Sequence, residues 1–302
     1  MPAERRFGAV RFLPGPNRGK YPHCHSVYVE GAGLLIDPGS DRERLRRLRA
    51  EEGVNEVWLT HWHEDHIAHL DLFDDLPLRL SAADAPMLAG IDAFLDGYGM
   101  QRPDFRRHWR RVLETDFRFR PRRPTGILHP GAVLRRGPLT VEVLHTPGHT
   151  PGHLSFFFRE PQVLLLGDYD LTPFGPWYGD RDAGIEATEA SVARLRQVPA
   201  RIRLAGHEEG VFEADPGERW DAYLEVIRVR EQRLFELLAT PRTLEEIVQA
   251  RIVYGRAREP AAFYAFGEQA IMEKHLRRLI AAGRVEERAG RYLRREGLTP
   301  PA

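Results

Sequence analysis

Residues 60–66 read THWHEDH and overlap the end of EVWLT at 56–60, whose apolar residues predict a strand. Within these residues His61, His63, Asp65 and His66 form an H-x-H-x-D-H pattern. The turn at the end of a strand can bring such side chains together in a cleft. For a chain with thirteen histidines, chance would produce this pattern on the order of once in a thousand sequences. We therefore interpret THWHEDH as part of a functional site.

The spacing within THWHEDH predicts ligands for two cations. His61 and His63 can face one cation together, while Asp65 and His66, at the start of the next helix, can face a second. Zinc accepts both imidazole nitrogen and carboxylate oxygen as ligands. Two cations require more than four ligands. The further candidates each follow a predicted strand: His149 in TPGHTPGH, Asp168 in LLLGD and His207 in RLAGH.

The stretch HTPGHTPGH at 145–153 has a histidine at every fourth residue. Residues four apart share one face of an α-helix, so His145, His149 and His153 would form a three-histidine face on a helix. Pro147 and Pro151 interrupt that helix, because an interior proline removes a hydrogen bond and clashes with the preceding turn. The stretch is therefore expected to form a loop.

Short apolar strands alternate with turns and helices over residues 1–214, which predicts a layered α/β domain. Strands are expected at 26–30, 33–39, 56–60, 139–146, 154–158, 162–168 and 201–207, and helices at 41–53 and 188–198. Residues 85–123 mix aromatic residues with many arginines and predict helices inserted between strands. This insertion is either a lid whose arginines attract an anionic substrate or an amphipathic excursion with a solvated arginine face.

Residues 215–302 predict a second, helical domain. A long helix over 220–239 precedes a helix that begins with a capping box, in which Thr243 lies three residues before Glu246. A third helix over 267–283 leads into a hairpin that turns at Ala289 and Gly290. Three helices followed by a hairpin are typical of a winged-helix domain, whose role can be nucleic-acid binding, dimer formation or purely structural.

Taken together, LLIDPG, THWHEDH, TPGHTPGH, LLLGD and AGH resemble, in the same order, the motifs of the metallo-β-lactamase superfamily of hydrolases, over about residues 20–210. This resemblance implies a four-layer αββα sandwich with a dinuclear site at one edge of its sheets. It implies that Asp168 bridges two metals, and that Asp37 of LLIDPG supports a ligand histidine, although a simple turn aspartate accounts for Asp37 equally well. By motif position, the ligands of the first metal are His61, His63 and His149, and those of the second are Asp65, His66 and His207.

Two divalent cations about 3.5 to 4 Å apart can lower the pKa of a shared water toward about 7, so that a metal-bound hydroxide attacks the substrate. We therefore expect a hydrolase with Asp65, His66 and Asp168 as catalytic residues and two divalent metal ions as cofactors, with zinc preferred over iron or manganese. Asp168 matches the bridging carboxylate of the thioesterase, lactonase and ribonuclease branches and argues against a true β-lactamase. The 38 residues between Asp168 and His207 leave no room for a β-CASP domain.

Three functions remain open. The first is hydrolysis of a small ester, thioester or lactone, with chemistry similar to that of glyoxalase II. The second is cleavage of single-stranded RNA, because the tail resembles the C-terminal winged helix of a branch whose characterised mitochondrial member is an endoribonuclease. The third is a regulatory winged-helix protein with a vestigial hydrolase domain. A group of four aromatic residues after the bridging aspartate either walls the pocket or packs as a surface loop: Tyr169, Phe174, Trp177 and Tyr178.

Basic and acidic residues number 44 each, so net charge gives no argument for nucleic acid as a partner. Cys24 is the only cysteine, which excludes an internal disulfide and a thiolate zinc cluster. The absence of a secretory signal or an apolar run of membrane length predicts a cytoplasmic protein with no membrane partner. A small-molecule substrate is the expected partner, and a homodimer remains open. Lysine occurs only at Lys20 and Lys274, which we interpret as codon bias toward arginine.

Overall fold

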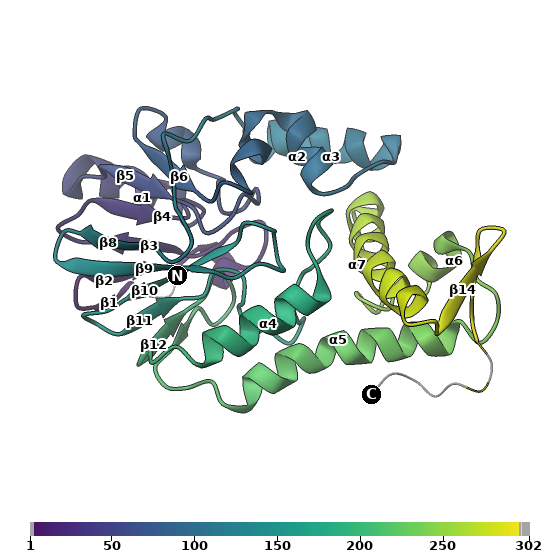
Figure 1. The fold of residues 1–302 in the computed structure, drawn as a ribbon. Helices are drawn as coiled ribbons and strands as arrows, with labels where there is room; N and C mark the ends of the chain where they lie inside the picture. Colours follow the sequence, from purple (N-terminus) through teal and green to yellow (C-terminus); the bar gives the residue numbers. More distant parts are fainter. Residues whose placement is uncertain (1–2, 296, 298–302) are drawn as a thin grey trace.

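The strands of the first domain form two sheets that lie face to face in the computed structural model, which describes residues 3–295 and 297 (Figure 1). The first sheet takes its strands in chain order: β1 (Arg5–Phe7), β2 (Val10–Leu13), β3 (Ser26–Val29), β4 (Leu34–Ile36), β5 (Glu56–Trp58), β6 (Leu78–Leu80) and β7 (Gly126–Ile127). The strands of the second sheet also follow chain order: β8 (Val133–Arg136), β9 (Leu139–His145), β10 (Leu154–Phe158), β11 (Val163–Leu165), β12 (Ile202–Leu204) and β13 (Val211–Phe212). Each sheet is therefore built from one continuous segment of the chain, 5–127 for the first and 133–212 for the second.

An apolar cluster fills the space between the two sheets. Val10 and Phe12 of β2 face Val141 and Val143 of β9 across this core, and all four side chains are buried. Successive residues of a strand point to opposite faces of its sheet, so every second residue of these strands enters the core. Burial of these side chains is what holds the sheets together.

Helices cover the outer face of each sheet. The first sheet carries α1 (Arg42–Arg47), continued by a π-helical turn over Leu48–Glu52, together with α2 (Ile91–Gly97) and α3 (Pro103–Thr115). The second carries α4 (Ile185–Arg196) and α5 (Glu218–Leu237). Short 3₁₀ helices lie at Pro16–Gly19, Leu70–Phe73 and Ala85–Ala89. The expected α/β architecture is confirmed, and α2 and α3 lie between β6 and β7, within residues 85–123.

The sheets are joined at the edge where β5 ends. The backbone amide of Leu154, the first residue of β10, donates to the carbonyl oxygen of Thr60 over 2.8 Å. In the first sheet β4, β5 and β6 run parallel, as do β11 and β12 in the second. Because the carboxyl ends of parallel strands meet at one edge, the loops after β5, β11 and β12 bring their polar residues together there.

The prediction that Asp65 and His66 begin a helix is wrong. His66 and Ile67 donate their backbone amides to the carbonyl oxygen of His63, and this single turn leads only to the 3₁₀ helix at Leu70–Phe73. In an α-helix, neighbouring residues point about 100° apart, so the side chains of His63, Asp65 and His66 could not all reach one site. The irregular turn allows all three to do so.

The tail contains the expected order of three helices and a hairpin. After α5 come α6 (Leu244–Gln249), α7 (Ala261–Ala281), β14 (Val285–Arg288) and β15 (Arg291–Arg294). The capping box is present, since Thr243 and Glu246 each bond the other's backbone amide. Ala289 and Gly290 both have positive φ at the hairpin turn. The division into domains at 214 and the winged-helix assignment stay predictions.

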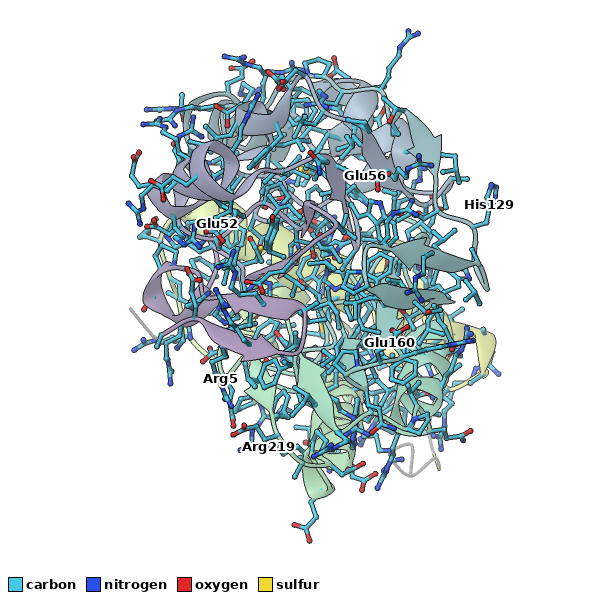
Figure 2. The ribbon with its side chains drawn as sticks, turned by 90° about the vertical axis from the view of Figure 1, so that its left-hand side faces the viewer. Arg5, Glu52, Glu56, His129, Glu160 and Arg219 are labelled. Carbon is cyan, nitrogen blue, oxygen red and sulfur yellow. The ribbon has the colours of Figure 1, made fainter. Side chains whose placement is uncertain are left out.

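The side of the sandwich opposite the tail carries many charged side chains (Figure 2). Glu52 pairs with Arg11 and Arg44, and Glu56 pairs with Arg79 and Arg136. These pairs range from buried, at Arg11, to half-buried, so their Coulomb gain is offset by the cost of removing the charges from water. Among the described residues, no helix combines the length and hydropathy of a membrane span.

Candidate metal centre

Seven buried side chains meet at the joined edge of the sheets. They fall into two groups whose nitrogen and oxygen atoms lie within 4.8 Å of one another: His61, His63, His149 and Asp168 in the first, and Asp65, His66 and His207 in the second. THWHEDH supplies four of them from the first half of the chain, and the loops after β9, β11 and β12 supply the rest. The structure thus brings together every residue predicted as a ligand.

In the first group three imidazoles converge on one point. His149 Nε2 lies 3.1 Å from His61 Nε2 and 2.9 Å from His63 Nδ1. Asp168 Oδ2 lies 3.3 Å from the same His149 nitrogen. Burial lowers the pKa of His61 and of His149 well below the usual value, so both imidazoles are neutral at pH 7. A neutral imidazole is the form that binds a metal.

In the second group the carboxylate of Asp168 is again central. Its Oδ1 lies 2.8 Å from His66 Nε2, and its Oδ2 lies 3.1 Å from His207 Nε2. His207 Nε2 also lies 3.5 Å from Asp65 Oδ2. Burial alone would lower the pKa of His207, but the neighbouring carboxylates, Asp168 foremost, outweigh it and raise that pKa to about 10. Asp168 therefore contacts both groups, which is the geometry of a bridging ligand.

The donor set fits divalent cations because hydrogen bonds alone leave buried atoms unsatisfied. His66 Nε2 and Asp168 Oδ1 are buried and lack a hydrogen bond, although only 2.8 Å separates them. Neutral imidazoles carry one proton each, so three ring nitrogens around a single point cannot all be paired. Imidazole and carboxylate are preferred ligands of zinc and also suit iron and manganese.

Asp37 contacts the predicted ligand His66 at the ring nitrogen that faces away from Asp168. Its Oδ2 lies 3.0 Å from His66 Nδ1 and accepts a hydrogen bond from Thr60 Oγ1, while its Oδ1 accepts from the Thr60 amide. The backbone of Asp37 has a φ of 54°, as a turn aspartate can adopt. Both interpretations of this residue therefore hold at once: the turn directs the carboxylate toward His66.

The HTPGHTPGH stretch is a loop between β9 and β10, and its three histidines differ in their contacts. His149 alone reaches the metal groups. His145 donates from Nε2 to the carbonyl oxygen of Pro151, and His153 bonds Thr146 Oγ1 through Nδ1 and accepts from the Asp168 amide at Nε2. The sequence-based expectation for the loop agrees with this geometry.

Two carboxylates near the site were missed at the sequence level. Asp180 Oδ2 accepts a hydrogen bond from His63 Nε2 over 2.9 Å, and its Oδ1 accepts from Trp177 Nε1. Glu64 accepts hydrogen bonds from Tyr21 and Tyr98, and burial, with Asp65 nearby, raises the pKa of Glu64 to about 8. Glu64 stands inside THWHEDH, which was a usable signal, whereas nothing in the local sequence singles out Asp180.

A cavity of about 510 Å³ opens above the metal groups. Its floor includes His63, Asp65, His149, Asp168 and His207. Of the four aromatic residues after the bridging aspartate, Phe174 and Trp177 line the cavity, whereas Tyr169 and Tyr178 are fully buried elsewhere. Phe174 and Trp177 therefore form part of the cavity wall, whereas Tyr169 and Tyr178 pack inside apolar core clusters.

The insertion and the tail supply the other aromatic walls. Tyr98 and Trp109 come from the insertion. From the tail come Tyr254, Phe263, Tyr264 and Phe266. The rings of Trp109 and Phe263 stack with centroids 5.1 Å apart. This contribution of the tail to the cavity was not foreseen, because the contact depends on how α7 packs against α3.

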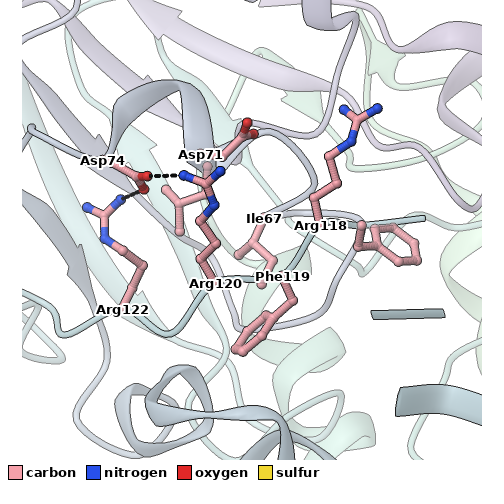
Figure 3. A pocket seen from close by; sticks show the side chains of 9 residues that line it. Ile67, Asp71, Asp74, Arg118, Phe119, Arg120 and Arg122 are labelled. Carbon is pink, nitrogen blue, oxygen red and sulfur yellow. Dashed lines mark hydrogen bonds and ion pairs between the residues drawn. The ribbon is translucent and has the colours of Figure 1, made fainter. Parts of the chain in front are cut away.

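The arginines of the insertion lie away from the metal cavity among the residues described. Arg106 pairs with Asp92 and Asp96 within the insertion. At its far end Arg120 and Arg122 pair with Asp74 beside a separate small pocket (Figure 3). The expectation of a lid whose arginines attract an anion is therefore not supported by these contacts. The insertion contributes aromatic rings instead.

The sequence of this chain matches one protein family over more than half of its length. The family described as the metallo-beta-lactamase superfamily matches residues 20–207. The chain is 32% identical over 141 residues to the probable metallo-hydrolase YqgX of Bacillus subtilis, covering 45% of this chain and 59% of that protein. It is 29% identical over 202 residues to the hydroxyacylglutathione hydrolase GloC of Haemophilus influenzae, covering 59% of this chain and 81% of that protein. The chain thus spans less than two thirds of the Bacillus relative.

Among solved structures, the metallo-beta-lactamase family protein TTHA1429 of Thermus thermophilus is similar over nearly the whole chain. The TM-score is 0.71 at 27% identity, with 95% of this chain and 99% of that chain covered. A beta-lactamase domain protein of Burkholderia ambifaria shares the fold, with a TM-score of 0.70 at 19% identity over 98% of this chain and 95% of that chain. The likeness to TTHA1429 extends beyond residue 207 and so includes most of the helical tail.

Proposed function

Because this chain belongs to the metallo-β-lactamase superfamily of hydrolases, we propose that it uses two divalent cations to hydrolyse a small ester, thioester or lactone. The observation that carries the proposal is the place of Asp168, whose carboxylate contacts both ligand groups: Oδ2 lies near His149 of the first and His207 of the second, and Oδ1 lies near His66 of the second. Two divalent cations, when bound, would lower the pKa of a water toward about 7 and polarise the scissile carbonyl. Zinc is our first choice of metal, with iron and manganese as alternatives.

The side chains divide the work in this proposal. His61, His63 and His149 hold the first cation, and Asp65, His66 and His207 hold the second, with Asp168 shared between them. Asp65, which also lines the cavity, orients the attacking water toward the substrate. Asp37 and Asp180 fix the imidazoles of His66 and His63, as second-sphere carboxylates do in metal sites.

A thioester with a bulky apolar acyl group fits the cavity best. Aromatic rings form its walls, and a largely apolar pocket with a few polar groups at the reacting end is typical of small-molecule sites. Relatives named hydroxyacylglutathione hydrolase, acyl-coenzyme A thioesterase and atrochrysone carboxyl ACP thioesterase support a thioester over other esters.

The charges around the cavity disfavour RNA as the substrate. Apart from the proposed metal ligands, its described lining includes two cationic residues, Lys20 and Arg258, and three acidic ones: Glu64, Asp170 and Glu208. Lys20 is already paired with Glu208. A single-strand groove needs cations that follow the phosphates. In the tail hairpin, Arg288 pairs with Glu286 and Arg291 with Glu246.

A regulator with a vestigial hydrolase domain is disfavoured because all seven ligand side chains still converge. Cytoplasmic location and a homodimer stay predictions.

The test is to load the purified protein with zinc, iron or manganese and to offer bulky and short acyl thioesters, a lactone and single-stranded RNA. We expect about two metals per chain and hydrolysis of the bulky thioester, lost in His61→Ala. Cleavage of RNA alone, also lost in His61→Ala, would establish a ribonuclease in place of the thioesterase. Less than one metal per chain would instead favour the regulator.

A further inference from the structure

Lys274 is a buried lysine that joins α7 to the loop at 180–183. Only 8% of it is exposed, and its Nζ donates to the backbone carbonyl oxygens of Asp180, Arg181 and Ala183, at 2.5, 2.9 and 2.7 Å. An ammonium group has three protons, so all three are used. Burying a charge is costly unless it is hydrogen-bonded in this way.

The choice of lysine here is not explained by codon bias. Of the chain's 44 basic residues only Lys20 and Lys274 are lysine. A guanidinium is planar and directs its donors into a fixed fork, whereas a compact ammonium can place three protons on three oxygens around one point. The contacts of Lys274 therefore require lysine in a chain that otherwise uses arginine.

The loop that Lys274 holds carries the carboxylate that contacts His63. Asp180 Oδ2 accepts a hydrogen bond from His63 Nε2 over 2.9 Å. With its proton on Nε2, His63 presents the lone pair of Nδ1, the atom 2.9 Å from His149 Nε2. A carboxylate partner of this kind fixes both the tautomer and the ring orientation of a metal-binding histidine.

We propose that Lys274 is a positioning residue for the first metal: by holding the carbonyls of 180–183 it fixes Asp180, and through Asp180 it fixes the ring of His63. The inference rests on the proposed metal binding. It gives α7 a role in the metal centre in addition to its aromatic residues in the cavity wall. Among the described residues, the second group, Asp65, His66 and His207, forms no hydrogen bond or ion pair with this loop, so it should be independent of Lys274.

The test measures metal affinity of the full chain by chelator competition, together with the absorption spectrum of the cobalt-substituted protein. Lys274→Met and Asp180→Asn should each weaken the first metal roughly 10- to 100-fold, the usual effect of losing a second-sphere partner. Both should change the cobalt spectrum and leave the second metal in place. Lys274→Arg should not restore the first metal, because the guanidinium cannot reproduce the three bonds.

The double variant tests whether Lys274 acts on His63 through Asp180. If Lys274 acts through Asp180, Lys274→Met combined with Asp180→Asn should lose no more affinity than Asp180→Asn alone, since coupled residues are not additive. Leu279→Ala is the matched control: it opens a cavity in the tail core from the same helix and should lower the unfolding temperature without changing metal affinity.

Three results would overturn the inference. These are a Lys274→Met protein that binds both cobalt ions with unchanged affinity and spectrum, a fully additive double variant, or an equal loss of metal in Leu279→Ala. A wild-type protein that binds no transition metal would overturn the inference together with the proposed function. Normal wild-type binding with an unaffected Lys274→Met variant would overturn the inference alone.

Discussion

His145 ends β9 and His149 follows four residues later in the loop, and only His149 belongs to a ligand group. Replacing His149 with alanine removes the nitrogen nearest to His61 and His63 and should reduce kcat/KM at least 100-fold, with the first metal lost. His145→Ala removes only the bond to Pro151 and should keep about two metals per chain. Metal content per chain and kcat/KM measured on both variants check this prediction. Equal metal loss in both variants would contradict the assignment of His149.

Gly206 offers a second test at the level of one residue. A Cβ at this position would lie 2.6 Å from Asp168 Oδ1 and 3.1 Å from His66 Cε1. Gly206→Ala should therefore displace the bridging carboxylate and lower the affinity for both metals, as measured by chelator competition.

Gly90→Ala is its control, since a Cβ there meets no atom within 4 Å and the backbone of Gly90 is extended. Unchanged metal binding in Gly206→Ala would mean that Asp168 does not bridge.

At the level of elements, the first turn of α7 should set the preference for the acyl group. Phe263 stacks on Trp109 and lies 5.2 Å, ring to ring, from Tyr21 at the cavity. Phe263→Ala removes part of an apolar wall, and loss of such contacts costs about 1 to 3 kcal/mol. We expect KM for a bulky acyl thioester to rise about 10-fold or more, with little change for an acetyl thioester.

Phe7→Ala, on a strand outside the cavity, should leave both KM values unchanged. An equal effect of Phe263→Ala on the KM of bulky and acetyl substrates would show that the tail does not determine the preference for the acyl group.

The sequence predicted elements well where the signal is local. Alternating apolar residues in LTVEVLHT gave β9, and Thr243 with Glu246 gave the start of α6. The turn at Asp65 and His66 was predicted wrongly. Its irregular backbone lets three side chains reach one site, and helix propensity of the residues does not report such a tertiary arrangement. The roles of Asp180 and Lys274 could not be predicted, because Asp180 contacts His63, and Lys274 contacts the backbone of Asp180, only through tertiary structure.

On the scale of the whole molecule, a buried Glu–His–Tyr set fixes the tail to the hydrolase domain. His275 of α7 bonds Glu231 of α5 through Nδ1 and Tyr178 through Nε2, with Arg230 and Arg278 nearby. Burial lowers the pKa of His275 despite the hydrogen bond to Glu231. The unfolded chain therefore takes up a proton below about pH 6.5 before the folded one does. Protonation thus favours unfolding as the pH falls.

His275→Gln should test this effect. The variant should be less stable at pH 7, because a buried partner is lost, but its free energy of unfolding should fall less steeply between pH 7 and 5. The slope attributable to His275 is at most about 1.4 kcal/mol per pH unit. Denaturant unfolding at several pH values measures it. A constant difference between variant and wild type across this range would show that His275 does not titrate differently on folding.

The order of strands has a consequence for how metal and folding are coupled. Each sheet comes from one continuous segment of the chain. The ligands divide accordingly: the first segment supplies His61, His63, Asp65 and His66, and the second supplies His149, Asp168 and His207. Neither segment can complete a site alone, so the cations of the proposed function would link the two segments. If free metal stood at a thousand times its Kd, a chelator should lower the free energy of unfolding by about 4 kcal/mol for each site, and the unfolding temperature with it. Two fragments, separated near residue 130 and mixed, should recover metal binding only when they dock.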